Sequence, residues 1–200
     1  VSFMQDICAH FAERKETLFM AVYLFDRYIS EVALKESSLV IYAFACLHIA
    51  MKYEEIYPPR LGEYALDVEP KEIILAESCI LKYLNFDLTY EGPFRYLEMW
   101  GDLLELSKED CEAVELLLTM CLSDEHWGRQ PASVLAAASI GLYSKLAKLD
   151  IKLTKLFEHI DQAAYQSCLR DMTTTINDNP ETFKNTCMRS TSEKWMRLFS

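Results

Sequence analysis

The sequence predicts an all-α protein made of two tandem five-helix bundles, each built around a central third helix. Apolar residues recur at helical spacing along nearly the whole chain, and no strand-like alternation is longer than chance. The 200 residues include only 5 Gly and 6 Pro, which argues against a loop-rich sandwich. Two uncharged stretches of fifteen residues, 37–51 and 130–144, begin about 90 residues apart and indicate one central helix in each half.

The first bundle is expected to hold five helices. A serine pair, Ser37-Ser38, can cap the third helix, which is expected to run to about Tyr53. The pair Pro58-Pro59 stops that helix, and its second proline suits the first turn of a short fourth one. Pro70 then opens the fifth helix. The apolar residues that keep the helical spacing in the first two helices are Phe3, Ile7, Phe11, Leu18, Val22, Phe25 and Ile29.

The second bundle follows Gly92-Pro93 and repeats this order. Ser107 with Asp110 three residues later is typical of a helix N-cap, Pro131 starts the third helix, and Asp161 caps the fifth. The elements expected here are residues 94–100, a helix after Ser107, a helix after Pro131, residues 153–160, residues 163–175 and a last element over 181–200.

Both third helices are rich in small residues. A helix that is apolar all round must be surrounded by neighbours, and small side chains let those neighbours approach closely. We therefore predict two domains, residues 1–90 and residues 91–200, each wrapped around its third helix. The small residues are Ala43, Ala45, Cys46 and Ala50 in the first, and Ala132, Ala136, Ala137, Ala138 and Ser139 in the second.

Charge and length exclude several classes of partner. There are 20 Lys and Arg against 31 Asp and Glu, a net charge of −11, and nucleic-acid binding needs a surplus of basic surface. The uncharged stretches are shorter than the roughly 20 residues that span a bilayer, so we expect core helices and no membrane partner. Seven cysteines without a C-x-x-C pair indicate a reducing compartment.

Catalytic groups do not converge in the sequence. The four histidines have no metal-ligand spacing, and no two glycines lie closer than nine residues, so there is no phosphate-binding loop. The adjacent acids Glu54 and Glu55 point about 100° apart around a helix and cannot share one ligand. We expect no enzyme activity, no metal site and no cofactor.

Two charged residues stand out on physical grounds. Glu77 lies inside the apolar stripe of its helix, and Lys52 follows fifteen uncharged residues. A charge in an apolar stripe is costly unless it is paired and hydrogen-bonded. One interpretation is that Lys52 and Glu77 pair with each other or lie at a solvated edge. The other is that they flank an apolar surface and bind a partner there.

Several segments resemble the cyclin family. Residues 51–59 read MKYEEIYPP, which closely resembles the end of the third helix of the cyclin box. Residues 16–18 and 25–28 resemble the E-T-L and D-R-[FY] of its second helix, residues 77–88 its fifth helix, and residues 131–137 the third helix of the second cyclin fold. The resemblance covers about residues 1–175, and its E-E-I-Y-P-P run points to the cell-cycle cyclins of the A, B and E types.

The resemblance implies two tandem cyclin folds and a non-catalytic subunit that binds and activates a cyclin-dependent protein kinase in cell-cycle control. It implies that Lys52 and Glu77 hydrogen-bond the kinase around its αC helix, that an apolar surface receives this helix, and that Glu55 lies at the edge of the contact. The kinase-binding residues expected from it are Ile49, Lys52, Tyr53, Glu54, Glu55, Glu77, Leu81, Phe86 and Leu88.

The resemblance also implies a docking patch for R-x-L motifs of substrates or inhibitors. The matching residues are Phe3, Asp6, Ile7, Leu39 and Val40. Phe3 stands where the family usually has Trp, and Val40 stands where many members have Gln. Plain core packing is the alternative interpretation of these positions.

The first helix of the cyclin box is incomplete in this sequence. The M-R-A-I-L segment of the family would precede Val1, and in the family Asp26 pairs with the arginine of that segment. A buried carboxylate without its partner is costly, so either the natural chain continues upstream of Val1 or another group serves Asp26, and we expect the first. A kinase regulator with reduced cysteines is expected in the nucleus and cytoplasm.

Two other functions compete with this one. A cyclin-fold adaptor, of the transcription-factor or the pocket-protein type, would not activate a kinase. An adaptor of the transcription-factor type should carry basic surface. A helical enzyme would need the catalytic groups that the sequence lacks. One experiment separates the kinase-activating subunit from the adaptor and from the enzyme. Only the kinase-activating subunit should bind a cyclin-dependent kinase with an affinity that falls when Lys52 or Glu77 is changed.

Overall fold

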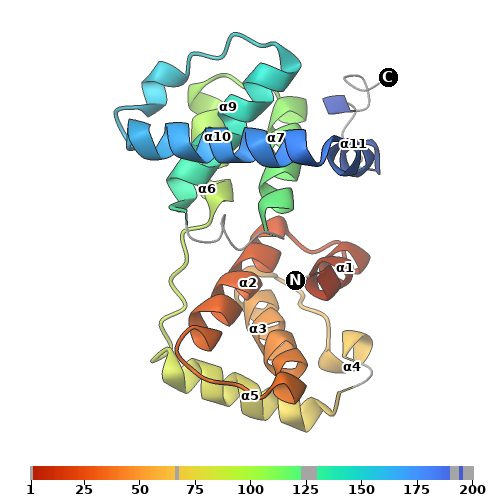
Figure 1. Cartoon of the computed structure of the whole chain (residues 1–200). Coiled ribbons are helices and arrows are strands. Elements are labelled where there is room, and N and C mark those ends of the chain that lie inside the picture. Colours follow the sequence, from red (N-terminus) through yellow and green to blue (C-terminus); the bar gives the residue numbers. More distant parts are fainter. Residues whose placement is uncertain (1, 66–67, 123–129, 190–193, 196–200) are drawn as a thin grey trace. The chain divides into compact units, whose positions relative to one another are not determined.

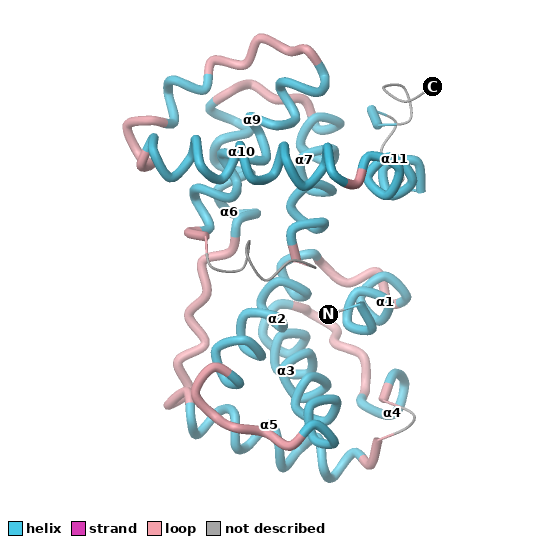
Figure 2. Tube along the Cα trace, viewed as in Figure 1, coloured by secondary structure: helices cyan, strands magenta, loops and turns pink. Residues whose placement is uncertain are grey.

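The structure, a computed structural model, describes residues 2–65, 68–122, 130–189 and 194–195. Every regular element in these ranges is helical, which confirms the all-α prediction (Figures 1 and 2). The chain divides by its contacts into two compact units, Val1–Gly92 and Pro93–Ser200. This division lies two residues from the predicted domain boundary.

The N-terminal unit is built around α3. Its elements are α1 (Ser2–His10), α2 (Lys15–Ile29), the 3-10 turn η1 (Glu36–Ser38), α3 (Leu39–Glu54), α4 (Leu61–Tyr64) and α5 (Pro70–Tyr83). Helix α3 packs against α1, α2 and α5. Its fully buried residues are Ala45, Cys46, Leu47, Ala50 and Met51, so the small side chains lie where neighbouring helices come closest.

Two details of this unit differ from expectation. The predicted serine cap is a 3-10 turn, and Ser38 makes no side-chain hydrogen bond to the start of α3. The fourth helix is a single turn that begins at Leu61, because Pro58-Pro59 is followed by an extended Arg60, whose N–H donates to Glu63 at 2.6 Å.

The C-terminal unit is built around α9 in the same way. Its elements are α6 (Pro93–Leu103), α7 (Lys108–Cys121), α9 (Ala132–Ala147), the 3-10 turn η2 (Leu153–Leu156), α10 (Gln162–Asp178) and α11 (Pro180–Arg189). Helix α9 packs against α6, α7 and α10, and every residue from Val134 to Ser144 is buried. The predicted fourth helix over 153–160 is only the turn η2, because so short a segment gains too few hydrogen bonds to nucleate an α-helix.

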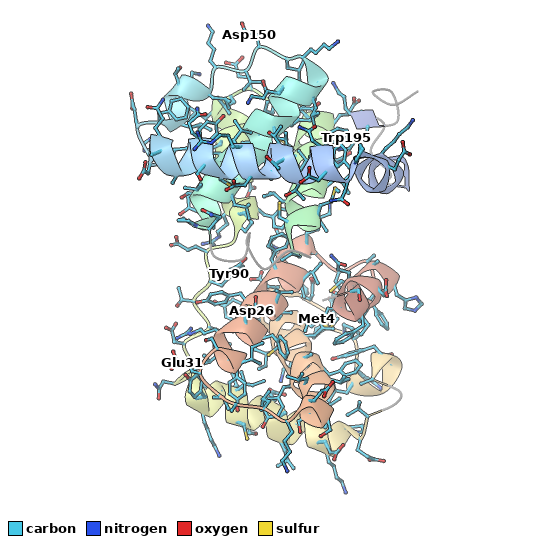
Figure 3. The ribbon with its side chains drawn as sticks, viewed as in Figure 1. Met4, Asp26, Glu31, Tyr90, Asp150 and Trp195 are labelled. Atoms are coloured by element: carbon cyan, nitrogen blue, oxygen red, sulfur yellow. The ribbon has the colours of Figure 1, made fainter. Side chains whose placement is uncertain are left out.

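The end of the described chain closes this unit. The indole N–H of the fully buried Trp195 donates to the carbonyl of Ala113 in α7 at 3.0 Å, and the indole contacts the Tyr143 ring edge-to-face (Figure 3). The ammonium of Lys194 lies 3.2 Å from the carboxylate of Asp110. Residues 194–195 thus complete the core beside α7 and α9, where the sequence predicted only a last element over 181–200.

Candidate partner-binding surface

Exposed apolar side chains are concentrated in one stretch of the sequence of the N-terminal unit. Of the twelve large hydrophobic side chains exposed in the described residues, seven lie between residues 53 and 86. Solitary exposed apolar residues are normal, whereas a concentration of them marks an interaction site. The seven are Tyr53, Ile56, Tyr57, Ile74, Leu75, Tyr83 and Phe86.

The centre of this region is an ion pair between α3 and α5. The ammonium of Lys52 donates a hydrogen bond to Oε1 of Glu77, with the side chains 41% and 14% exposed. Ile74 lies one turn before Glu77 and Leu81 one turn after it, on the same face of α5. We call Lys52, Tyr53, Ile74, Glu77, Leu81 and Phe86 the α3–α5 surface. The interpretation that the two charges pair with each other is therefore correct for the free chain.

The turn after α5 presents Phe86 on a strained backbone. Asn85 and Phe86 have φ angles of 49° and 57°, in the left-handed region that costs roughly 1–2 kcal/mol for a residue with a side chain. The N–H of Phe86 donates to the carbonyl of Leu81 at 2.9 Å, which holds the turn against the end of the helix. Phe86 is nevertheless 69% exposed. Positive φ angles also follow α1, α6 and α9, at Ala12, Glu105 and Lys148, so this turn is a helix-ending conformation that leaves the Phe86 ring open to solvent.

The predicted kinase-binding residues are not all on this surface. Lys52 and Tyr53 are exposed, Phe86 is exposed, and Leu81 and Leu88 are half-buried. Ile49 was expected on the apolar surface, and this expectation is corrected: Ile49 is 3% exposed and belongs to the core. On a helix that is apolar on nearly every side, spacing alone does not separate the covered positions from the open ones.

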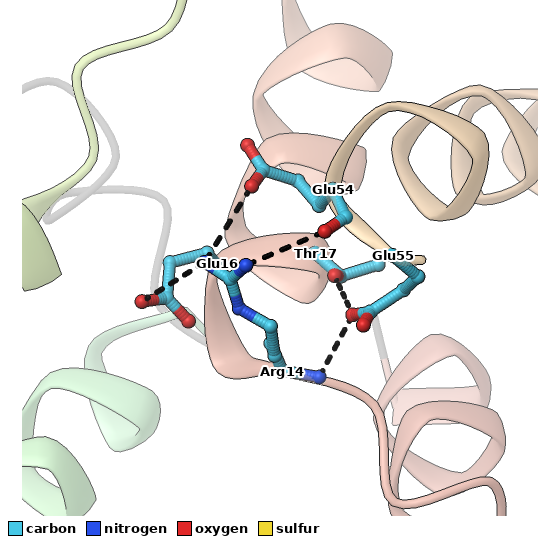
Figure 4. A network of polar contacts seen from close by, with 5 residues as sticks. All are labelled: Arg14, Glu16, Thr17, Glu54 and Glu55. Atoms are coloured by element: carbon cyan, nitrogen blue, oxygen red, sulfur yellow. Dashed lines mark hydrogen bonds and ion pairs between the residues drawn. The ribbon is translucent and has the colours of Figure 1, made fainter. Parts of the chain in front are cut away.

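Glu54 and Glu55 are directed toward the segment between α1 and α2 (Figure 4). The backbone N–H of Arg14 donates to Oε1 of Glu55 at 2.9 Å, and the hydroxyl of the buried Thr17 donates to the same oxygen. The guanidinium of Arg14 lies 3.8 Å from the carboxylates of both Glu54 and Glu16. These contacts fasten the last turn of α3 to the start of α2.

The predicted R-x-L docking residues lie on α1 and at the start of α3. Phe3, Asp6 and Ile7 share one face of α1, with Asp6 exposed and the other two half-buried. The Phe3 ring lies 5.1 Å from the ring of Phe44 in α3. Leu39 is half-buried and Val40 is 50% exposed. The docking role of these residues remains a prediction.

One argument drawn from the sequence does not hold. Asp26 was expected to be a buried carboxylate that needs a partner from a preceding segment, but Asp26 is exposed (Figure 3). Water screens and solvates an exposed carboxylate, so the cost invoked for it does not arise.

The sequence reasoning missed part of the exposed region. Ile56 and Tyr57 are 86% and 91% exposed and lie directly after α3, and Ile74 and Leu75 are exposed on α5. A signal was available for the first two: the apolar pair Ile56-Tyr57 stands between acids and the helix-stopping prolines, where no helix face can bury it.

Neither a metal site nor a membrane helix is found in the described ranges. No three His, Cys, Asp or Glu side chains there are placed to hold a metal ion, while His126 lies outside these ranges. No described helix is both long and apolar enough to cross a bilayer.

Comparison with known proteins agrees with the all-helical fold. Residues 1–89 match the family model "Cyclin, N-terminal domain". The chain is 30% identical over 144 residues to the G2/mitotic-specific cyclin-B3 of Gallus gallus, an alignment that covers 70% of this chain and 36% of that protein. The chain thus spans about a third of the length of this curated relative.

Two solved structures share the fold. A viral cyclin from herpesvirus saimiri aligns with a TM-score of 0.76 at 16% identity. The alignment covers 87% of this chain and 81% of the viral cyclin chain. A chain of the yeast RNA Pol II CTD kinase CTDK-1 complex aligns with a TM-score of 0.74 at 18% identity. This alignment covers 98% of the present chain and 72% of the chain from the complex. At under 25% identity these two structures show the fold alone. The family match over residues 1–89 and the relative of mitotic-cyclin name place the chain in the cyclin family.

Proposed function

We propose that this chain is a non-catalytic subunit that binds a cyclin-dependent protein kinase through the α3–α5 surface and activates it. The curated relative named above is a G2/mitotic-specific cyclin, and one structure of the same fold belongs to a kinase complex. The observation that carries the proposal is the exposed apolar side chains around the Lys52–Glu77 pair, where burial by a partner would gain free energy.

The ion pair suits recognition of a helix. Lys52 uses one of three ammonium hydrogens on Oε1 of Glu77, and the second carboxylate oxygen keeps its acceptor capacity. The remaining donors and acceptors can bond the polar groups at the end of a kinase helix without breaking the pair. Tyr53 and Phe86 then pack on the apolar face of that helix, as aromatic anchors do in many interfaces.

Activation follows from selective binding of one kinase conformation. A kinase is active when the αC glutamate pairs with the β3 lysine. A partner that binds only this arrangement shifts the population toward it, and moving the ratio from 1:99 to 99:1 takes about 5.5 kcal/mol of differential affinity. An interface of standard size supplies energy on this scale.

Two further expectations belong to this proposal. The exposed Asp6 beside Phe3 and Ile7 suits an R-x-L motif, since the acid can bind the arginine and the apolar walls the leucine. A regulator of this kind acts in the nucleus and cytoplasm, with its thiols reduced. All seven cysteines are thiols, five of them buried.

The test is co-elution of the chain with each of a panel of cyclin-dependent kinases, together with histone phosphorylation. The variant Lys52→Ala/Glu77→Ala should lose at least tenfold in affinity, because truncating a desolvated charge pair at an interface costs about 2 kcal/mol or more. The matched control is Lys108→Ala/Glu112→Ala, which removes an exposed pair 3.9 Å apart in the C-terminal unit and should bind as the wild type does.

Each outcome decides between the candidate functions. Raised kinase activity that the first variant loses and the control keeps supports the proposal. Binding without activation indicates a cyclin-fold adaptor. If the folded chain binds no kinase of the panel, the proposal is wrong.

A further inference from the structure

A partly buried hydrogen bond lies one helical turn below the Lys52–Glu77 pair. The Tyr64 hydroxyl of α4 lies 2.7 Å from Nδ1 of the His48 imidazole in α3. His48 stands four residues before Lys52, so the two side chains share a face of α3. The bond therefore joins α4 to the part of α3 that presents Lys52.

Aromatic side chains fix the direction of the Tyr64 hydroxyl. Tyr64 is buried, and its ring meets that of Phe11 edge-to-face with 6.1 Å between centroids. The Phe44 ring of α3 lies 6.2 Å from it. A ring packed in this way cannot turn freely, so its hydroxyl stays aimed at Nδ1 of the half-buried His48.

The direction of this hydrogen bond sets the state of the imidazole. Burial raises the pKa of the Tyr64 phenol, and the nearby Glu77, Glu13 and Cys8 raise it further, so the phenol keeps its proton near pH 7. A phenol O–H is a stronger acid than the N–H of a neutral imidazole, and it therefore acts as the donor. The single N–H hydrogen of the His48 ring is then on Nε2.

The charged groups around the imidazole come from α3 itself and from α5. Burial lowers the pKa of His48 below its ordinary value of 6.5, the Lys52 ammonium lowers it further, and Glu77 of α5 opposes both. A proton on His48 would place a second positive charge one turn from Lys52. It would also compete for the Glu77 carboxylate that Lys52 binds.

We propose that His48 and Tyr64 are positioning residues of the α3–α5 surface, because their hydrogen bond keeps an uncharged imidazole below the Lys52–Glu77 pair and leaves Glu77 to Lys52 alone. A partner that covers this surface then desolvates one balanced ion pair and no further charge. The inference rests on the proposed function and adds a property to it: the protonation of His48 sets the lower pH limit of partner binding.

The sign of the pH dependence follows from linkage. His48 takes up a proton near pH 6.5 in the unfolded chain, whereas the folded chain resists it. Stability is therefore complete above about pH 6.5 and falls as the pH drops from there toward the lower folded pKa. A covering partner disfavours the charged imidazole more strongly still. Affinity thus falls in acid, by no more than about tenfold per pH unit because one proton is involved.

The first test reads the imidazole of the free chain directly. Proton–nitrogen NMR spectra should show the Nε2–H tautomer of His48 near pH 7, with a titration midpoint below 6.5. Tyr64→Phe keeps the packed ring but removes the donor, so both neutral tautomers should appear in this variant. A wild type with the hydrogen on Nδ1, or with a charged His48 near pH 7, overturns the proposal.

Kinase affinity between pH 5.5 and pH 8 tests the positioning role. His48→Asn places an acceptor, Oδ1, where Nδ1 stands, but it cannot take up a proton. The matched control is His10→Asn, which removes an exposed histidine at the end of α1. Affinity should fall in acid in the wild type and the control and stay flatter in His48→Asn.

Rescue by the conservative variant separates positioning from packing. Near pH 7, Tyr64→Phe should weaken kinase binding by up to about fivefold, since one hydrogen bond is lost, whereas His48→Asn should bind as the wild type does. Groups that titrate elsewhere contribute to all four proteins, so the differences between the proteins report His48. Equal pH slopes in the wild type and His48→Asn, or unchanged affinity in Tyr64→Phe, overturn the positioning role. If no kinase binds, the proposed function and the positioning role both fail, and the NMR spectra still decide the state of the imidazole.

Discussion

Each unit has a lysine–acid pair, and the two pairs are placed very differently. Glu77 and Asp110 are similarly covered, at 14% and 12% exposure. Asp110 also accepts from the hydroxyls of Ser107 and Tyr143, and Trp195 lies against that tyrosine. Among the residues that the structure describes, Glu77 bonds only Lys52, and the neighbouring side chains of Tyr53 and Ile74 are exposed. One pair closes a core, while the other stands at an open surface.

The central helices differ in the same way. Helix α9 is buried without interruption from Val134 to Ser144, whereas α3 ends in the exposed Lys52 and Tyr53. Both helices begin as uncharged stretches of equal length. What separates them is how completely neighbours surround their middle turns, because both helices have an exposed lysine in the last turn, Lys52 in α3 and Lys145 in α9.

The largest effect is expected from Trp195→Ala, which opens the closed unit. Truncating a fully buried tryptophan costs about 3–5 kcal/mol, and the Ala113 carbonyl also loses its donor. Urea unfolding followed by circular dichroism should show this loss. Phe86→Ala is the matched change at the open surface, and it should alter the unfolding free energy by less than about 0.5 kcal/mol. Equal losses in the two variants would contradict the comparison.

A smaller effect is expected from Asp110→Asn, which weakens the closed pair. Burial opposes ionisation of Asp110, but hydrogen bonds from Ser107, Tyr143 and Lys194 lower its pKa below 3.8. The stabilisation that ionised Asp110 gives the fold is therefore complete above about pH 4. It is lost as the pH falls through the lowered pKa of Asp110 in the folded state. The variant should lose about 1–3 kcal/mol at pH 7, with the difference shrinking in acid.

The control for this pH profile is Glu77→Gln. Its ion pair has an exposed lysine and should contribute less than about 1 kcal/mol to folding. Denaturant midpoints between pH 3 and 7 test both variants. A difference between wild type and Asp110→Asn that stays constant down to pH 3 would argue against the role given to Asp110.

A modest effect on folding, of the opposite sign, is expected from Phe86→Gly. Glycine adopts a φ of 57° without strain, so the variant should gain about 1 kcal/mol of unfolding free energy. Under the proposed function it should bind a cyclin-dependent kinase more weakly than the wild type does, because the exposed ring is gone. Urea midpoints and co-elution together test this. A variant that is destabilised, or one that binds the kinase as the wild type does, would show that Phe86 serves the fold and not the surface.

Helical periodicity predicted much of the fold. It placed the end of α3 within a residue of Glu54 and the start of α5 at Pro70, because prolines and apolar spacing are local signals. The docking of Trp195 on α7 joins residues 82 positions apart, and no local pattern encodes such a contact.

Only part of the candidate site could be predicted from the sequence. The pairing of Lys52 with Glu77 was one of the interpretations that the cost of a charge within an apolar stripe suggested. The burial of Ile49 could not be read in this way, since nearly every residue around it on α3 is apolar. The exposure of Ile56 and Tyr57 depends on where the chain goes after the helix, which only the folded backbone shows.

The proline pair after α3 has a consequence for the entropy of association. Pro58 restricts Tyr57 to extended backbone angles, and Pro59 does the same to Pro58. Ordering a free backbone costs roughly 1–2 kcal/mol per residue, and this segment has surrendered much of that freedom before any partner arrives. When a partner binds the Ile56 and Tyr57 side chains, the main remaining entropic cost is therefore that of fixing their rotamers. This cost is about 0.5–1.5 kcal/mol for each side chain.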